Sequence, residues 1–513
     1  MDDDLRSIQE ARDLVERAAA ASRAFAAADQ ETVDRIVRAV GGAAARAAER
    51  LARLAVDETG MGVYEHKVLK NRFSAVDLLA YILPMRTVGV IGKDRERKVR
   101  ELAVPMGVVG AIIPTTNPTS TAIYKALISI KARNAIVMSP HPRATRCVVE
   151  TARIMEEAAV AAGAPAGLIA CMTAPTLDGT NALMRHRRTA VILATGGTEL
   201  VRAVYTAGKP AYGVGPGNVP AIIERTARIE KAVADVVDGK TFDAGVLCSA
   251  ENSVVCDAPV ESEVREAFRR ERAHFCSPDE KRALERVMIP ATGKGIAPEV
   301  VGRSPQAIAR LAGFAIAPDA RLLVVDLHAV GSEDPLSREK LSPVLGFFVE
   351  NGWERCCERA IALLQYGGLG HTLAIHSRDE HVIEQFFLEK PAFRIVVNSN
   401  SALGAVGFTT GFAPAMTLGP GAWGGSITSD NITPLHLINI KRLGEEIRPY
   451  RDPLRATASA PSRALSRDRP RPLRAASPPS SAAVPERQVP ALPPPEVQRI
   501  VDDFLREFRA GHR

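Results

Sequence analysis

Cysteine and long apolar runs are both scarce in this chain. Only 7 of its 513 residues are cysteines, and a chain of this length can bury a sizeable core without disulfides. The cysteines show neither metal-ligand spacing nor a paired framework, which fits a reducing cytosol and predicts no metal site. No window approaches the roughly 18 uninterrupted apolar residues that a membrane span needs. The acidic N-terminus MDDDLRSIQE lacks an apolar signal-peptide core, so we expect neither secretion nor membrane insertion.

The positive charge of the chain is concentrated near its C-terminus. The formal net charge is +7, but residues 451–513 contain 12 Arg and 7 Asp or Glu. The rest of the chain is therefore close to neutral. Basic charge in a proline-rich tail is more often solvation than nucleic-acid recognition, so no nucleic-acid partner is expected.

Apolar segments alternate with helical segments over residues 107–225. The expected strands are 108–113, 135–139, 167–172 and 190–194, and each is followed by a helix. Alternation of this kind is typical of a doubly wound α/β sheet, which binds ligands at the carboxyl ends of its strands. A second α/β pattern runs to about residue 415. We therefore predict a cofactor-binding domain at 1–226, which begins with Ala- and Arg-rich helices, a catalytic domain at 227–415 and a return segment at 416–450.

The composition changes at residue 451. Residues 451–495 contain 11 prolines among many Ser, Ala and Arg residues, a composition typical of disordered linkers. Beyond them, Val497, Ile500, Val501, Phe504, Leu505 and Phe508 fall on one helical stripe. We predict a disordered linker at 451–495 and an amphipathic helix within 496–513. Such a helix is marginal alone and needs a partner surface.

Three loop segments suggest the chemistry. Cys248 lies in the small-residue sequence Gly245-Val-Leu-Cys-Ser-Ala250. The polar turn Thr115-Thr116-Asn117-Pro118 follows one predicted strand, and Thr195-Gly196-Gly197-Thr198 follows another. A single cysteine is more often structural than reactive, and an Asn before Pro is common in turns. Taken one at a time, the segments would favour those structural roles.

Together, and in this order, the segments resemble the aldehyde dehydrogenase superfamily and, within it, the coenzyme-A-acylating branch. The likeness is carried by PTTNPTSTAIYKALISIKARNAIVMSPHPR (114–143), by residues 241–252 and by GGLGHTLAIH (367–376). It covers about residues 1–450. The resemblance implies a two-lobed α/β fold, in which a Rossmann-type cofactor domain and a catalytic domain are joined by an oligomerisation element. It also implies a dimer or tetramer.

The resemblance also implies roles for individual residues. Cys248 would be the nucleophile, and Asn117 with the Cys248 backbone N–H would stabilise the oxyanion. Thr115, Thr116, Gly196, Gly197 and Thr198 would face NAD. Pro140 and His141 would line the adenine end, which NAD and coenzyme A share, and Glu339 would bind the nicotinamide ribose. The alternatives are that His141 only forms a turn and that Glu339 is a solvated surface residue. The resemblance gives His371 no role, and we expect a structural one.

One departure from the family separates two reactions. Hydrolytic members carry a Glu that activates water, whereas Gly213 stands at the matching place in Gly213-Val-Gly-Pro-Gly-Asn218. General-base help is worth roughly 10²–10⁴ in rate. We therefore expect the acyl group to pass to coenzyme A, so that a small aldehyde, NAD⁺ and coenzyme A give acyl-CoA and NADH. The alternatives are a hydrolytic enzyme and an inactive scaffold of the same fold.

The tail resembles encapsulation peptides of bacterial microcompartments. This resemblance implies a shell-protein partner for residues 496–513 and a location in the bacterial cytoplasm, inside a microcompartment lumen. Docking of the helix on its own enzyme, or a contact between subunits, is the alternative.

Overall fold

The computed structural model describes residues 2–293, 295–450 and 452. The chain divides into two compact units, Met1–Ile447 and Arg448–Arg513. All the elements below belong to the first unit. The predicted helix at 496–513 lies outside the described residues, as does the predicted linker at 451–495 apart from residue 452.

A five-stranded parallel sheet forms the first lobe. Its strands follow the order β5-β4-β3-β6-β7, with β3 (Val108–Ile113), β4 (Ala135–Pro140), β5 (Ile169–Cys171), β6 (Thr189–Thr195) and β7 (Ala211–Val214). Every residue of β3 and β4 is buried, because helices cover both faces of such a sheet. The expected strands are therefore present, with ends that differ by no more than two residues.

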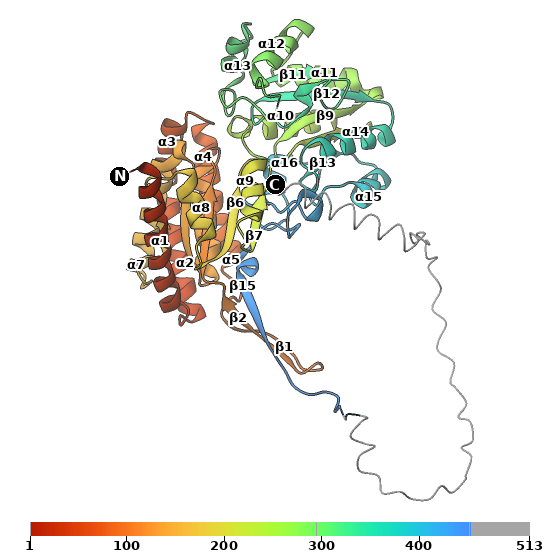
Figure 1. The fold of residues 1–513 in the computed structure, drawn as a ribbon. Helices are drawn as coiled ribbons and strands as arrows, with labels where there is room; N and C mark the ends of the chain where they lie inside the picture. Colours follow the sequence, from red (N-terminus) through yellow and green to blue (C-terminus); the bar gives the residue numbers. More distant parts are fainter. Residues whose placement is uncertain (1, 294, 451, 453–513) are drawn as a thin grey trace, which may run out of the picture. The chain divides into compact units, whose positions relative to one another are not determined.

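Helices cover this sheet on both faces (Figure 1). α1 (Asp3–Phe25) and α8 (Leu177–Arg185) pack together, while α6 (Pro118–Lys131) and α7 (Thr145–Ala161) pack together with α2 (Gln30–Arg46) against them. The other helical elements of this lobe are α3 (Ala48–Thr59), α4 (Tyr64–Arg72), η1 (Phe73–Asp77), α5 (Leu78–Ile82), η2 (Pro142–Ala144) and α9 (Thr198–Tyr205). The doubly wound α/β prediction is confirmed.

The strand order places a topological switch point between β3 and β6. From β3 the chain moves outward through β4 and β5, then returns to the other side of β3 as β6 and β7. Connections therefore leave β3 and β6 in opposite directions, which opens a crevice at their carboxyl ends. Thr115, Thr116 and Thr195 lie at this crevice.

The second lobe contains a seven-stranded parallel sheet with the order β10-β11-β12-β9-β8-β13-β14. The strands are β8 (Val219–Ile223), β9 (Glu251–Asp257), β10 (Ala273–Phe275), β11 (Leu322–Asp326), β12 (Val344–Glu350), β13 (Leu373–His376) and β14 (Ile395–Val397). The division between the sheets therefore lies before β8. The boundary expected at 226 had assigned β8 to the first domain, because a short apolar strand does not reveal which sheet it joins.

Helices of the second lobe connect its strands. They are α10 (Ile229–Thr241), α11 (Glu261–Arg270), α12 (Pro278–Met288), α13 (Pro305–Ala312), α14 (Trp353–Tyr366), α15 (Glu380–Glu389) and α16 (Ser401–Ala405), with short turns η3 (Phe242–Gly245), η4 (Ala258–Val260), η5 (Pro335–Ser337), η6 (Ala422–Gly424) and η7 (Pro434–Leu437). The turn η3 joins α10 to the segment that carries Cys248.

A three-stranded antiparallel sheet joins distant parts of the chain. β1 (Gly89–Asp94) pairs with β2 (Val99–Pro105), and β15 (Ile438–Gly444) pairs with the other edge of β2. The predicted return segment therefore brings the chain back beside β2 (Figure 1). None of the helices in the described part of the chain combines the length and apolar character that a bilayer crossing requires.

Candidate active site

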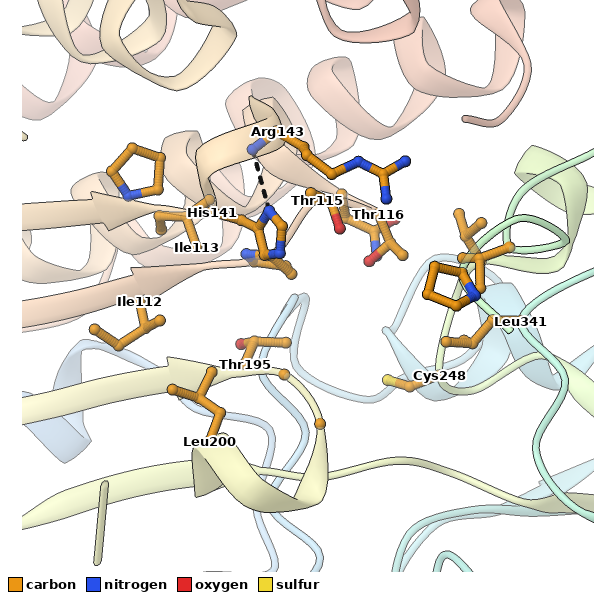
Figure 2. Close-up of a pocket in the computed structure, with 18 of the residues that line it drawn as sticks. Ile112, Ile113, Thr115, Thr116, His141, Arg143, Thr195, Leu200, Cys248 and Leu341 are labelled. Atoms are coloured by element: carbon orange, nitrogen blue, oxygen red, sulfur yellow. Dashed lines mark hydrogen bonds between the residues drawn. The ribbon is translucent and has the colours of Figure 1, made fainter. Parts of the chain in front are cut away.

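A cavity of about 640 Å³ lies at the carboxyl ends of β3, β4, β6 and β7. Cys248 and Leu341 of the second lobe close it from the opposite side (Figure 2), and Glu339 also lines it. Most of the predicted site residues line this one cavity: Thr115, Thr116, Asn117, Pro140, His141, Gly196, Gly197, Cys248 and Glu339. Segments far apart in the sequence thus meet at the switch point, as the doubly wound topology requires.

Cys248 follows a turn with an unusual backbone. Asp243, Ala244 and Gly245 have φ of 50°, 55° and 73°, in the left-handed region that costs an ordinary L-residue roughly 1–2 kcal/mol. The turn reverses the chain after α10 and places the partly buried Cys248 on the cavity wall. Gly217 packs directly against this segment, and a larger residue would clash, because a β-carbon on Gly217 would lie 2.2 Å from the Cys248 carbonyl oxygen.

The Cys248 thiol is protonated at rest. Burial raises its pKa to about 12, the negative charge of Glu339 adds to the increase, and Arg394 opposes it. Burial disfavours the charged thiolate form of this side chain. Nucleophilic attack therefore requires the thiol to lose its proton within the assembled complex.

Asn117 is the N-cap residue of α6 and is only 8% exposed. Its side chain does not cap the helix. Instead, Nδ2 donates to Thr116 Oγ1 at 3.0 Å, and Oδ1 accepts a hydrogen bond from Lys70 Nζ. The amide is therefore held by two partners, and Asn117 lines the same cavity as Cys248. A turn-forming role for this side chain does not account for these contacts.

The opposite wall fits a dinucleotide. Gly196 and Gly197 form the turn between β6 and α9, and Gly197 is the N-cap of that helix. Backbone N–H groups at such a position attract phosphate. Thr195 Oγ1 is buried beside this turn and has no partner within the described residues. An unsatisfied hydroxyl in a cavity wall fits a bound polar ligand.

His141 directly follows β4 and lines the cavity. Its Nδ1 accepts the backbone N–H of Arg143 at 3.2 Å, which caps the turn η2 (Figure 2). Burial, and secondarily the charge of Arg143, lower the pKa of His141 below its usual value. The ring is therefore neutral and orders a turn, and it also forms part of the wall.

Glu339 is the only acidic residue among the described cavity-lining residues. It is not a solvated surface residue: Oε1 accepts the Gly217 N–H at 2.9 Å. Burial raises the pKa of Glu339 to about 7, although this hydrogen bond and Lys240 oppose the increase. The carboxyl is thus half ionised near neutral pH, within electrostatic reach of Cys248.

Gly213 does not line the cavity. Gly213 is a buried residue of β7, and a β-carbon there would lie 3.1 Å from the Tyr205 ring and from Val201. Successive strand residues face opposite sides, so it is the next residue, Val214, that reaches the wall. Gly213 is therefore not positioned to contact a ligand. Thr198 is the first residue of α9.

Several polar residues near the site are buried, and of these only Asp243 and His371 lie in segments that carried the family likeness. Lys67 and Lys70 on α4 lie buried against Asp243. Arg394 is 2% exposed and donates to the Ser429 and Gly419 carbonyls. His371 is also buried, and its Nδ1 is 2.9 Å from Thr372 Oγ1. Their spacing resembles that of surface residues, and only tertiary packing reveals their burial.

His274, Cys276 and Glu280 form the one cluster with metal-ligand chemistry in the described residues, with ligand atoms within 4.8 Å of one another. Glu280 already accepts the Ser277 N–H in the capping box of α12, and His274 Nε2 lies 3.2 Å from it. None of the three lines the cavity. Helix capping accounts for the position of this carboxylate.

Comparison with known proteins identifies the family to which this fold belongs. Residues 6–282 match the sequence profile of the aldehyde dehydrogenase family. The chain is 40% identical over 444 residues to the bifunctional aldehyde-alcohol dehydrogenase of Escherichia coli, covering 86% of this chain but only 50% of that protein. It is 37% identical to the acetylating succinate-semialdehyde dehydrogenase of Clostridium kluyveri, over 84% of this chain and 95% of that one.

Solved structures agree. An acetylating aldehyde dehydrogenase from Geobacillus thermoglucosidasius superposes with a TM-score of 0.87 at 48% identity, covering 88% of this chain and 100% of that one. A Rhodopseudomonas palustris propionaldehyde dehydrogenase, solved with bound CoA and an acylated cysteine, gives 0.77 at 26%, over 85% and 97%. A propionaldehyde dehydrogenase from a Clostridium phytofermentans fucose-utilisation microcompartment gives 0.75 at 27%, over 84% and 96%. The predicted fold is confirmed.

Proposed function

The chain belongs to the aldehyde dehydrogenase family, and we propose that it converts a small aldehyde, NAD⁺ and coenzyme A into acyl-CoA and NADH. One observation carries the proposal: Cys248 and Asn117 line one cavity, and the same cavity includes a switch-point crevice with a Gly-Gly turn at a helix N-terminus. A nucleophile, an oxyanion donor and a dinucleotide site are the groups that oxidation through a thioester requires.

The reaction follows from these groups. The Cys248 thiol would give up its proton to solvent water as Sγ adds to the aldehyde carbon, and the carbonyl oxygen would become an oxyanion near Asn117. NAD⁺, held by Gly196, Gly197 and Thr195, would supply the acceptor for the hydride from that carbon, so that a thioester would remain on Cys248. The thiol of coenzyme A then attacks the thioester, and the Cys248 sulfur leaves. Gly196, Gly197 and Thr195 would hold the dinucleotide, with Pro140 and His141 at its adenine end and Glu339 at its nicotinamide ribose.

The choice of coenzyme A over water rests on the residues around Cys248. Val214 occupies the wall at the end of β7, and an apolar side chain there cannot activate water. A thiol needs less help than water, because part of it is ionised near neutral pH. The acetylating relatives and the neighbour with bound CoA support the same choice.

Glu339 favours a second candidate function. A partly buried carboxyl with a pKa of about 7 can act as a general base, and one that activated water would make the enzyme hydrolytic. The discriminating experiment incubates the purified protein with aldehydes and NAD⁺, with and without coenzyme A, and identifies the products by mass spectrometry. Acyl-CoA with coenzyme A, and at most one NADH per site without it, supports the first function. Rapid stoichiometric acid without coenzyme A supports the second.

Assembly forms another part of the proposal. We propose a dimer or tetramer, supported by the exposed apolar side chains Ile440 (40% exposed) and Leu443 (45%) on β15, and by the open edge of β14. Ile440→Asp with Leu443→Asp should reduce the oligomer mass measured by light scattering. An unchanged mass would place the subunit contact elsewhere.

The tail has a separate proposed role. We propose that residues 496–513 bind a shell protein and place the enzyme in a microcompartment lumen in the bacterial cytoplasm. The apolar stripe in this sequence and the microcompartment origin of one neighbour support this. Residues 490–513 fused to a fluorescent protein should form foci in a compartment-producing host, and Phe504→Asp should disperse them. Diffuse signal from both fusions would contradict targeting, and a changed oligomer mass after truncation would assign the tail to subunit assembly.

A further inference from the structure

Four buried polar residues connect the Cys248 turn to the Asn117 loop. Lys70 Nζ donates both to the Asp243 carboxylate and to Asn117 Oδ1. Lys67 Nζ lies 3.0 Å from the same carboxylate and 3.0 Å from the Thr116 carbonyl oxygen. Lys67, Lys70 and Asp243 are 2%, 4% and 0% exposed. Buried charges are costly unless they are paired, so this arrangement is held by its own ion pairs.

The contact with Lys70 determines which way the Asn117 amide faces. An ammonium group only donates hydrogen bonds, so the side of the amide that faces Lys70 must be Oδ1. Nδ2 is then on the other side, where one of its hydrogens is donated to Thr116 Oγ1 at 3.0 Å. The second Nδ2 hydrogen has no partner in the described residues, and Asn117 lines the cavity. Without Lys70, the reversed amide would present an oxygen instead.

Asp243 fixes the other end of the network. Its left-handed backbone, with φ of 50° and ψ of 40°, begins the turn that leads to Cys248. Its Oδ1 accepts the Val63 N–H at 2.7 Å, and its own N–H donates to His66 Nδ1 at 2.8 Å. An unfavourable backbone conformation persists where surrounding contacts specify it. Asp243 is therefore tied to α4 and to the chain just before it.

Lys70 and the Asp243 carboxylate favour each other's charged forms. Burial lowers the pKa of Lys70 to about 7, and Asp243 opposes that decrease. Burial pushes the pKa of Asp243 upward, but Lys70 and Lys67 outweigh it and hold the pKa below its usual value. The carboxylate is thus the group that keeps a proton on Lys70 beside Asn117.

We propose that Lys70, held by Asp243, is a positioning residue that orients the Asn117 amide so that its free N–H faces the oxyanion, and joins this donor to the turn that carries Cys248. The inference rests on the proposed function, in which Asn117 is an oxyanion donor. Loss of a donor typically costs about 10²–10³ in kcat. Loss of its orientation should cost less, roughly 10–10²-fold, because a correctly turned amide is still sampled.

Lys67 provides a matched control for the test. Lys70→Met and Lys67→Met each remove one buried ammonium and leave Asp243 with one lysine partner, so similar decreases in thermal stability are expected. Of these two lysines, only Lys70 donates a hydrogen bond to the Asn117 side chain. Lys70→Met should lower kcat for CoA-dependent NADH formation roughly 10–10²-fold with little change in KM for NAD⁺, whereas Lys67→Met should stay within about threefold. Equal losses of kcat would overturn the inference.

A double-mutant cycle separates orientation from general structure. In an Asn117→Ala background, Lys70→Met should cost no more than about a further twofold, because the group that it orients is gone. Full additivity would contradict the inference. Normal kcat in Asn117→Ala would instead refute the proposed function of Asn117. A loss in Asn117→Ala with normal kcat in Lys70→Met would refute the inference alone.

Glutamine variants cover the case in which the methionine variants do not fold. Lys70→Gln and Lys67→Gln are both neutral, and each keeps hydrogen-bond donors in the buried site. Lys70→Gln should lose kcat relative to Lys67→Gln, and its loss should again disappear in the Asn117→Ala background. Indistinguishable kcat values in the two glutamine variants would overturn the inference.

Discussion

Gly217 packs against the backbone of Cys248, so closely that a β-carbon on Gly217 would lie 2.2 Å from the Cys248 carbonyl oxygen. Gly217 is itself held by its N–H, which donates to Glu339, and by its carbonyl, which accepts from Asn252 Nδ2 at 3.0 Å. The segment between β7 and β8 thus supports the nucleophile from behind. Several expected outcomes follow from such contacts.

Gly217→Ala should move the Cys248 peptide and lower kcat for NADH formation at least about tenfold, with a stability loss of roughly 1–3 kcal/mol from overpacking. Gly215→Ala is the matched control, since a β-carbon at Gly215 meets nothing within 4 Å. Steady-state rates and denaturant unfolding measure the two effects. Comparable kcat in the two variants would mean that the close packing does not position Cys248.

Cys248→Ala should abolish aldehyde-dependent NADH formation while NAD binding, followed by fluorescence titration, persists. Loss of a covalent nucleophile costs orders of magnitude. Cys256→Ala is a suitable control, because Cys256 is a buried residue of β9 that does not line the cavity. More than about a tenth of the wild-type rate in Cys248→Ala would contradict its assignment as the nucleophile.

Val214→Glu should increase acid release in the absence of coenzyme A by about tenfold or more, since a well-placed base is worth roughly 10²–10⁴. The neighbouring Gly213→Glu should destabilise the protein without this gain, because its side chain would meet Tyr205 and Val201. Acid can be measured by mass spectrometry after the first NADH burst. Higher hydrolysis in Gly213→Glu than in Val214→Glu would show that position 213, and not 214, faces the thioester.

Alkylation of Cys248 in the ligand-free enzyme should depend steeply on pH. With a thiol pKa of about 12, the thiolate fraction rises tenfold per pH unit below that value. Inactivation by iodoacetamide should therefore accelerate from pH 7 to 10 without a plateau. Glu339 ionises near pH 7, and its charge raises the Cys248 pKa, so Glu339→Gln should react faster than wild type above pH 7 only. A plateau below pH 8 would contradict the protonated resting thiol.

Acid should destabilise the fold through two buried histidines. Burial lowers the pKa of His371 and of His376 to about 3, whereas an unfolded histidine titrates near 6.5. The unfolded chain therefore binds more protons between these values, and stability falls as pH decreases below 6.5. Each histidine contributes about 1.4 kcal/mol per pH unit.

Removing one of these histidines should flatten that dependence by about one proton. His376→Gln should show a shallower decrease in the free energy of unfolding between pH 6 and 5 than wild type, measured with urea. The exposed His328 provides the control, and His328→Gln should retain the wild-type slope. An unchanged slope in His376→Gln would show that its ring is charged in the folded protein.

Much of the cofactor-binding sheet could be predicted because its strands are buried. The runs at 108–113 and 190–194 are almost continuously apolar and end at polar turns, so both the strands and the ligand edge are recognisable. The family likeness then identified residues such as Cys248 and His141 that meet in the cavity. Sequence and topology together accounted for this part of the site.

Other features depended on information that the sequence does not carry. Lys67 and Lys70 lie in an apparently polar helix, and only its packing against residues far along the chain makes them buried. Strand register decides which side chain of β7 faces the cavity. The prediction was off by one residue, because Val214 lines the cavity and Gly213 does not. The sheet to which β8 belongs was likewise decided by its pairing with β9 and β13.

Sharing of one cavity by two nucleotides would also determine the order in which they bind and leave. Pro140, the Gly196–Gly197 turn and Cys248 line one cavity, and the proposed function requires both nucleotides to reach Cys248 there. Under the proposed function, we therefore expect NADH to depart before coenzyme A enters, while the acyl group stays on the Cys248 sulfur. Initial rates measured against one nucleotide at several fixed concentrations of the other should give parallel double-reciprocal lines. The lifetime of the thioester, rather than any contact between the two nucleotides, links the two halves of the reaction.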